Sequence, residues 1–168
     1  MTTIKFDSSS LIYLVKLDFL NHLENQYSTI IIPNNVKVEI VDEGKIRGKS
    51  DAYIIEREIS LGKIMVEAPS NNLQFNLGDG ETAVINLALD EEKVKPLVCI
   101  DDLKAEKIAF NLNINIISSD ILILQSLKKK IITRKECENY LTKISIIAGF
   151  PATRAIKNMQ IVELIDKS

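Results

Sequence analysis

The chain has 168 residues, contains no tryptophan, one histidine and two cysteines, and is only 5% aromatic. His22 has no partner motif, which argues against acid–base catalysis by histidine. Cys99 and Cys137 lie far apart without CxxC or Cys/His spacing, and so indicate neither a zinc site nor a disulfide framework. Because aromatic side chains are scarce, the chain offers few surfaces on which nucleic-acid bases can stack.

Long apolar runs and a strong charge of one sign are also lacking. No segment approaches the roughly 18 apolar residues of a membrane span, and no charged N-terminal segment leads into an apolar one. We therefore expect a soluble, cytoplasmic protein without a membrane partner. The net charge of −2 argues against nucleic-acid binding by bulk charge alone. Local basic patches around an acidic site stay compatible with such binding, because a bound divalent cation reverses the local sign.

What the sequence does contain is a regular alternation of short apolar runs and segments with helical spacing. Hydrophobic residues make up 46% of the chain and charged residues 26%, as in a globular domain with an aliphatic core. The runs, rich in Ile, Val and Leu, predict strands at 3–6, 28–33, 63–68, 96–100 and 114–118. Near-continuous apolar strands separated by helices are typical of a parallel α/β sheet covered on both sides.

The last part of the chain is predicted to be helical. Helices are expected at 118–130, 133–149 and 153–166, the second beginning with Thr133 and Glu136 in capping-box spacing. We expect one domain over residues 1–168, with 131–168 as a helical extension packed on it. The segments 42–51 and 70–81, rich in glycine and polar residues, predict exposed loops.

Acidic residues stand where two of the predicted strands end. Asp7 follows the first strand, and Asp101 and Asp102 follow the strand at 96–100. In an open parallel sheet, ligands bind outside the carboxyl ends of the strands, at the point where the strand order reverses. If the first strand is central, these carboxylates project into one crevice, where a hard divalent cation would offset their repulsion.

Two further acids interrupt apolar helical segments. Glu39 lies in the helix predicted after the second strand, and Glu81 begins a helix after a Gly-Asp-Gly turn. Structural roles are possible for all of these acids. Asp7, Asp101 and Asp102 can be helix N-caps, Glu81 can complement a helix dipole, and Glu39 can be a solvated surface residue. A residue at a strand end can also cap a helix and bind a metal at the same time.

Four stretches together resemble the PIN-domain family, in particular its small prokaryotic, toxin-type branch. They are "DSSSLI" (7–12), "PNNVKVEIV" (33–41), "GDGETAVINLA" (78–88) and "IDDLKAEKIA" (100–109). The resemblance covers nearly the whole chain. It implies a three-layer α/β/α sandwich with a central, mainly parallel sheet of about five strands, and a ribonuclease site that depends on Mg²⁺ or Mn²⁺.

The resemblance also assigns site residues. The four acids of the family match Asp7, Glu39, Glu81 and Asp101, which would be the catalytic residues and the metal ligands. Ser9 matches a hydroxyl near the first acid, and Asp102 is close enough in sequence to assist. The chain departs from the family at Glu106, where relatives often carry arginine. Asp120 either adds to the acidic cluster or is an acid in the first turn of a helix.

The partners expected from this resemblance are an RNA substrate, a small antitoxin protein if the chain is the toxin of a toxin–antitoxin pair, and a second copy in a homodimer. Basic residues could contact the RNA backbone or could simply be solvated. The candidates are Lys104, Lys128, Lys129, Lys130 and Arg134. The main alternative to the nuclease is a PIN-fold protein of weak or lost catalysis that acts by binding.

Other acidic α/β sites fit the sequence less well. A receiver domain needs an acidic pair at the first strand, where Asp7 stands alone. A haloacid-dehalogenase-type phosphatase needs DxD, but Ser9 occupies the second position, and Leu11 breaks the DxSxS pattern of a metal adhesion site. A P-loop is absent from the sequence.

Overall fold

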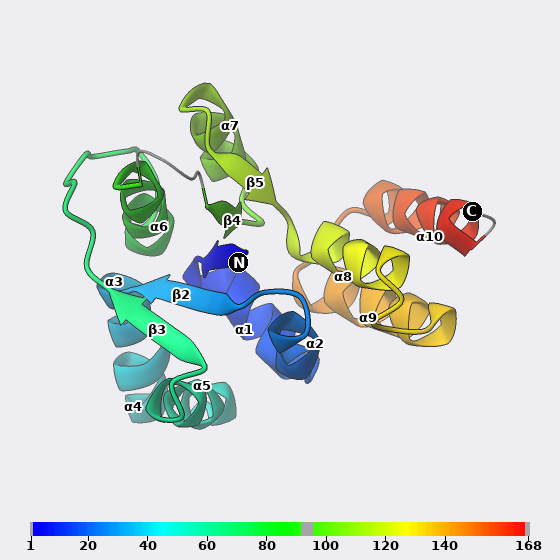
Figure 1. Ribbon diagram of the computed structural model, residues 1–168, viewed down its shortest axis with the longest axis horizontal. Helices are drawn as coiled ribbons and strands as arrows, with labels where there is room; N and C mark the ends of the chain where they lie inside the picture. The colour runs from blue at the N-terminus through cyan, green and yellow to red at the C-terminus, as the bar shows by residue number, and fades with distance from the viewer. Residues whose placement is uncertain (1, 92–95, 167–168) are drawn as a thin grey trace.

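A parallel sheet forms the centre of the protein, shown by the computed structural model, which describes residues 2–91 and 96–166. Its five strands follow the order β3-β2-β1-β4-β5 (Figure 1). The strands are β1 (Thr3–Phe6), β2 (Thr29–Pro33), β3 (Ile64–Glu67), β4 (Leu97–Cys99) and β5 (Asn115–Ile117). Each strand lies within its predicted range, and the predicted parallel α/β fold is confirmed.

The strand β1 is central, and the strand order reverses there. From β1 the chain builds β2 and β3 on one side, and it then adds β4 and β5 on the other. Phe6 is paired with Cys99, so β1 and β4 end side by side at the same edge of the sheet. This edge is the switch point at which parallel sheets of this kind bind ligands.

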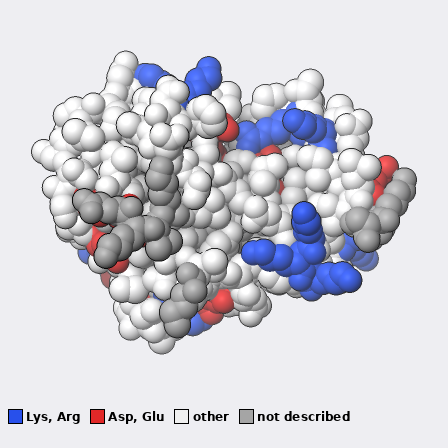
Figure 2. Space-filling view, turned by 45° about the horizontal axis from the view of Figure 1, so that its top comes forward, with Lys and Arg blue, Asp and Glu red and all other residues white. Residues whose placement is uncertain are grey.

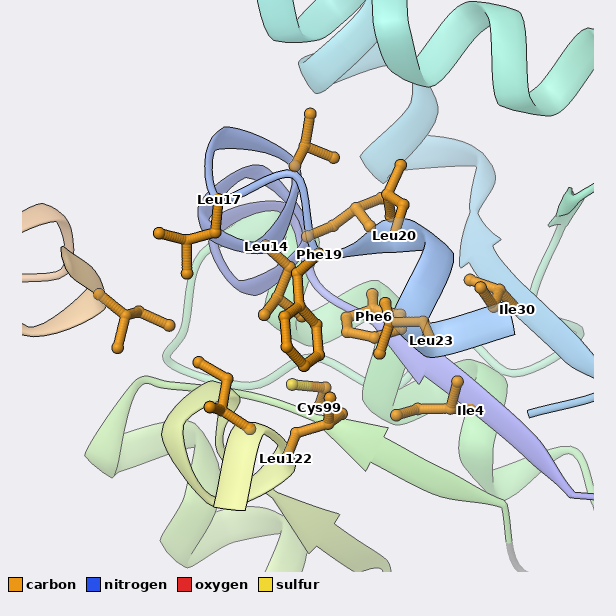
Figure 3. Close-up of a cluster of buried hydrophobic side chains, with 14 of the residues drawn as sticks. Ile4, Phe6, Leu14, Leu17, Phe19, Leu20, Leu23, Ile30, Cys99 and Leu122 are labelled. Atoms are coloured by element: carbon orange, nitrogen blue, oxygen red, sulfur yellow. The ribbon is translucent and has the colours of Figure 1, made fainter. Parts of the chain in front are cut away.

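Helices cover both faces of the sheet, and side chains at β4 alternate between two cores: Cys99 belongs to the larger core, Val98 and Ile100 to the smaller. Ile4 and Phe6 point into a large core together with Cys99, and Figure 3 shows these side chains packed against Leu14 and Leu122. The helices that contribute to this core include α1 (Ser8–Lys16), α2 (Leu20–Glu24), α5 (Ser50–Ser60), α8 (Ser119–Lys128) and α9 (Arg134–Ile147). The opposite face carries a smaller core with α6 (Asp79–Leu89) and α7 (Leu103–Asn111). The three-layer α/β/α arrangement follows from these two cores.

Lys5, between Ile4 and Phe6, points to the opposite face from them and is 1% exposed. Its Nζ donates to the carbonyl oxygen of Leu87 at 2.9 Å and lies 2.6 Å from Glu91 Oε1. Both partners lie at the C-terminal end of α6, where the free carbonyl groups of a helix attract a positive charge. The buried charge is therefore paired and ties α6 to the central strand.

The segment after β2 corrects one prediction. Residues 42–51, expected to form an exposed loop, are largely helical: α3 (Asn34–Lys37) continues into the π-helical segment η1 (Val38–Glu43) and then α4 (Gly44–Ile46). Gly44 has helical dihedral angles, and a Cβ built on it would lie 3.0 Å from the Ala52 Cβ. Glycine therefore serves here for close packing against α5, and only Gly48, with a φ of 68°, marks a turn.

Three helices follow the last strand. Besides α8 and α9 these include α10 (Ala152–Asp166), and Figure 1 shows them together at one end of the molecule. Thr133 and Glu136 form the predicted capping box of α9, and Gly149 follows that helix with a φ of 66°. Within the described ranges, no helix combines the length and the apolar character needed to cross a membrane.

Candidate active site

Asp7 lies at the junction of β1 and α1 and is fully buried, with 0% exposure. Its Oδ1 accepts a hydrogen bond from the backbone N–H of Ser10 at 3.0 Å and another from the Ser10 hydroxyl. Ser9 Oγ donates to the other carboxylate oxygen at 3.1 Å. Asp7 is therefore the N-cap of α1, and its position at the switch point leaves this capping role compatible with a role in a site.

Burial raises the pKa of Asp7 to about 7, because a charged carboxylate loses its hydration inside the protein. The hydrogen bonds from Ser10 act in the opposite direction, whereas the negative charges of Asp101 and Glu81 raise the pKa further. Asp101 and Glu81 are thus both close enough to repel the Asp7 carboxylate. A positive charge placed among them would favour the ionised form of Asp7.

Asp101 follows β4, whose end lies beside the end of β1. Its Oδ1 accepts from the backbone N–H of Ser119 at 2.9 Å, and its Oδ2 accepts from the Ser119 hydroxyl. Burial raises the pKa of Asp101, the hydrogen bonds from Ser119 lower it, Asp120 raises it and Arg154 lowers it. The first residue of α8 therefore fixes the orientation of this carboxylate.

Glu39 reaches the same region from the π-helical segment η1. Ser8 Oγ donates to Glu39 Oε2 at 2.6 Å. The approach is close: a Cβ at Gly80 would lie 2.8 Å from Ser8 Oγ and 3.3 Å from Glu39 Oε2. Three elements, α1, η1 and α6, therefore meet at a point where only glycine fits without a shift. Single π-helical turns are frequent at functional sites because they redirect one side chain.

Glu81 lies in the first turn of α6, with Gly78 as the N-cap residue. A negative charge at this position suits the positive end of the helix dipole, which is the structural role considered for Glu81 from the sequence. Glu81 and Glu39 also line the same cleft, which has a volume of about 390 Å³. The other residues that line this cleft are Ser8, Ser9, Ile12, Tyr13, Gly78, Asp79 and Gly80.

Several residues of this cleft were not predicted from the sequence. Ser8 carries the hydroxyl bound to Glu39, Asp79 lies beside Glu81, and Tyr13 brings an aromatic ring to the wall. Burial and the charges of Asp101 and Asp7 raise the pKa of Tyr13, which places its phenol near the acids. The spacing from Asp7 to Tyr13 covers less than two turns of α1, and this periodicity was the available signal.

Asp102 and the predicted basic residues lie elsewhere. Asp102 is exposed and caps α7, because its Oδ1 accepts from the backbone N–H groups of Lys104 and Ala105 at 2.9 and 2.8 Å. Lys129 lies over the Tyr27 ring at 5.4 Å, and Arg134 pairs with Glu138 at 2.7 Å. Figure 2 shows Lys and Arg side chains gathered over the half of the molecule that carries α8, α9 and α10. None of the predicted basic residues lines the cleft of about 390 Å³.

Asp120 is engaged in an ion pair that the sequence did not reveal. It lies in the first turn of α8, is 1% exposed, and binds both Nε and Nη2 of Arg154 at 2.7 Å. Although burial alone would raise it, hydrogen bonds from Arg154, Ser118 and Asn158 bring the pKa of Asp120 down to about 2. An arginine thus does reach the neighbourhood of Asp101, but it comes from α10, 34 residues from Asp120.

The donor chemistry of the site suits a hard divalent cation. The side chains of Asp7, Asp101, Glu81 and Glu39 offer carboxylate oxygens, the ligands that Mg²⁺ and Mn²⁺ prefer. Burial raises the pKa values of Asp7 and Asp101, and a bound cation would offset this cost by favouring the ionised carboxylates. Over residues 2–91 and 96–166, however, no group of three His, Cys, Asp or Glu side chains is arranged to hold a metal ion. Binding would therefore need side-chain rotation or bridging waters.

Comparison with known proteins points in one direction. A sequence model described as the PIN domain matches residues 3–159. No curated protein sequence matches the chain. Among solved structures, the chain is similar to a PilT N-terminus domain protein from the hyperthermophilic archaeon Sulfolobus solfataricus P2. The TM-score is 0.55 at 21% identity, over 75% of this chain and 94% of the other, so this likeness concerns the fold alone.

Proposed function

Because the chain belongs to the PIN-domain family, whose members are commonly nucleases, we propose that it is a divalent-metal-dependent ribonuclease. The observation that carries the proposal is the meeting of buried Asp7 with Asp101 and Glu81 at the switch point of the sheet. Glu39 and Glu81 line the adjoining cleft, which is open to a substrate. The N-cap role of Asp7 accounts for one buried carboxylate, but it does not require other carboxylates beside it, and like charges close together are costly to bury.

In this proposal the metal ligands are Asp7, Asp101, Glu81 and Glu39, acting directly or through water. PIN domains typically use divalent metals, and Mg²⁺ or Mn²⁺ is the cation proposed here. When bound, the cation supplies Lewis acidity, which makes a water more acidic and offsets the charge that develops on the phosphate. The reaction would be hydrolysis of an RNA phosphodiester bond.

The chain itself would hold the acids in position. Ser10 orients Asp7, Ser119 binds both oxygens of Asp101, and Ser8 binds Glu39. Ser9 donates to Asp7 and supports the same carboxylate. These hydrogen bonds restrict the carboxylates and so reduce the entropy lost when substrate and metal bind, even though the side chains must still rotate or bind through water.

Residues outside the acidic cluster would support the acids and bind the RNA backbone. Asp102 would support the site indirectly, because as N-cap it fixes the start of α7 beside Asp101. The basic residues Lys104, Lys128, Lys129, Lys130 and Arg134 would contact the RNA backbone farther from the cleft.

A second candidate is a PIN-fold protein that acts by binding, with weak or no catalysis. The observation that favours it is that the acids, as they stand, do not form a ready group of metal ligands. Action as the toxin of a toxin–antitoxin pair is compatible with either candidate. Expression of the chain in bacteria, with growth arrest as the measurement, would test that role separately.

Cleavage of end-labelled RNA with Mn²⁺ or Mg²⁺ tests the proposed chemistry. We expect cleavage that EDTA abolishes and that Asp7→Asn reduces at least about a hundredfold, since a ligand carboxylate is lost. Asp18→Asn is the matched control, because Asp18 is exposed and its φ of 56° suits asparagine. Calorimetry with Mn²⁺ on the same three proteins measures binding independently of activity. Cleavage that survives both EDTA and Asp7→Asn would refute the metal-dependent mechanism.

A further inference from the structure

Two further hollows adjoin the acidic cleft of about 390 Å³, and we call the three together the groove because neighbouring hollows share lining residues. A hollow of about 540 Å³ shares Glu39 and Asp79 with the cleft. A third hollow, of about 440 Å³, shares Asn34, Asn35 and Asp79 with the second. The groove thus runs from the cleft past the start of α3 to the segment that connects β3 to α6.

The third hollow is lined largely by side-chain amides, and we name it the amide groove. Half of its twelve lining residues are asparagine or glutamine: Asn34, Asn35, Asn71, Asn72, Gln74 and Asn86. Such side chains carry paired hydrogen-bond donors and acceptors without charge. Four of them already make hydrogen bonds within the protein: Asn71, Asn72, Gln74 and Asn86. Within the described part of the chain, the side chains of Asn34 and Asn35 form no hydrogen bond and are exposed. They are free to bind a ligand.

The far wall of the amide groove is held in place from α6. The Asn86 amide, 3% exposed, donates to the carbonyl oxygen of Leu73 at 2.9 Å and accepts from its N–H at 3.0 Å. Asp90 accepts from the backbone N–H groups of Ser70 at 2.6 Å and of Asn71 at 3.1 Å. A connecting segment fixed at both positions is a preorganised surface, which costs less to order on binding.

The charges along the groove decide which part of a nucleic acid fits it. The middle hollow carries Glu39, Glu43 and Asp79 against a single cation, Arg47, which is itself paired with Glu43 at 2.7 Å. This surface repels phosphates, which need basic side chains. Neutral base edges, in contrast, match amide donors and acceptors, and unpaired RNA exposes those edges.

We propose that the amide groove binds unpaired bases of the RNA strand beside the cleaved phosphate and thereby gives the enzyme a base preference. The phosphates of that strand face outward, toward solvent, and only the cleaved one enters the acidic cleft. The inference rests on the proposed nuclease function, because it names the part of that substrate that the groove selects. Asn34 and Asn72 are the specificity-determining residues, since they line the groove from two different segments, α3 and the connection from β3 to α6. Asn72 Oδ1 accepts from Gln74 Nε2 at 3.1 Å, and its Nδ2 is left to donate to a base.

Cleavage of an unstructured RNA library of random sequence, followed by sequencing of the new ends, tests this proposal. We expect wild type to favour particular bases within a few nucleotides of the cut. Asn34→Ala and Asn72→Ala should each reduce this preference about tenfold, the value of one lost bidentate base contact. Asn139→Ala, in the exposed part of α9, is the matched control and should keep the wild-type preference. Equal preference in all four proteins would overturn the proposal.

A binding measurement separates this proposal from the nuclease itself. The variant Asp7→Asn, titrated by fluorescence anisotropy with labelled A, C and U homopolymers, should discriminate among them. The double variant Asp7→Asn/Asn34→Ala should bind them with nearly equal affinity. If wild type cleaves no RNA but this discrimination is found, the catalytic proposal fails and the base-binding groove stands. If Asp7→Asn already binds the A, C and U homopolymers with equal affinity, the groove does not discriminate among bases.

Discussion

Replacement of Arg154 by methionine should destabilise the protein strongly, because it leaves the Asp120 carboxylate buried without its cation. Asp120 is 1% exposed and binds two guanidinium nitrogens of Arg154 at 2.7 Å, while the Arg154 side chain keeps 25% exposure. Loss of one partner of a buried ion pair costs about 3–5 kcal/mol. Methionine is an apolar side chain that can still pack on the Phe150 ring, but it loses the cation–π interaction of the guanidinium, which lies over that ring at 3.8 Å.

The structure places the expected loss at the lower end, at about 3 kcal/mol of unfolding free energy. Asn158 Nδ2 still donates to Asp120 at 2.7 Å and Ser118 Oγ at 2.6 Å, and the first turn of α8 also favours a negative charge. Urea unfolding at pH 7 measures the effect. The pH dependence of this contribution to the unfolding free energy follows from the pKa of Asp120, which is held at about 2. The stabilisation by the ion pair is present above pH 4 and is lost as the pH falls through 2.

Two further variants make the result decisive. Arg47→Met removes an exposed pair, Arg47 with Glu43 at 64% and 48% exposure, and should cost no more than about 0.5 kcal/mol. The double variant Asp120→Asn/Arg154→Met removes the buried charge as well and should recover most of the lost stability. Two results would refute the reasoning: an equal loss in Arg154→Met and Arg47→Met, or a double variant as unstable as Arg154→Met.

Three other expectations concern the acidic cleft. In EDTA, Asp7→Asn should stabilise the protein at pH 8 but not at pH 4. The reason is that a folded-state pKa raised to about 7 makes the stability of the wild type fall as the pH rises from 4 to 7. Urea midpoints that are equal for variant and wild type at both pH values would contradict this. Gly80→Ala should lower the cleavage rate on the order of tenfold to a hundredfold without changing the melting temperature. The added Cβ would lie 2.8 Å from Ser8 Oγ and would displace it. An unchanged cleavage rate would show that this contact is unimportant for activity. Tyr13→Ala should weaken single-stranded RNA binding about tenfold in anisotropy titrations, while Tyr13→Phe should retain it if the ring stacks on a base.

Most of the fold could be predicted because its strands are encoded locally. A run such as "TIKF" reads as a strand from its own composition, and Asp7 marks the end of that run. Residues 42–51 misled the prediction because glycine and charge are typical of loops. Gly44 is needed for a contact with Ala52, which sequence periodicity does not show.

The acids of the candidate site could be proposed from their place after strands and in helices, whereas the residues that hydrogen-bond to them could not. The pairing of Asp120 with Arg154 joins α8 to α10, and no local pattern relates residues 34 positions apart. Asp102 shows that sequence position alone does not separate a site residue from a helix cap. It follows the same strand as Asp101, but its carboxylate accepts hydrogen bonds from the backbone of α7. Hydrogen-bond partners depend on side-chain directions, which spacing alone leaves open.

The buried Lys5 has a consequence for where Glu81 stands. A helix of 11 residues such as α6 spans about 16 Å, and Lys5 fastens its last turn to the central strand while Glu81 lies in its first. The helix is stiff along its axis, so a shift at the fastened end is carried to the acid at the other. A substitution of Lys5 can therefore misalign Glu81 without touching RNA or metal. The central strand thus sets the spacing of the acids twice, through Asp7 at its end and through Lys5 within it.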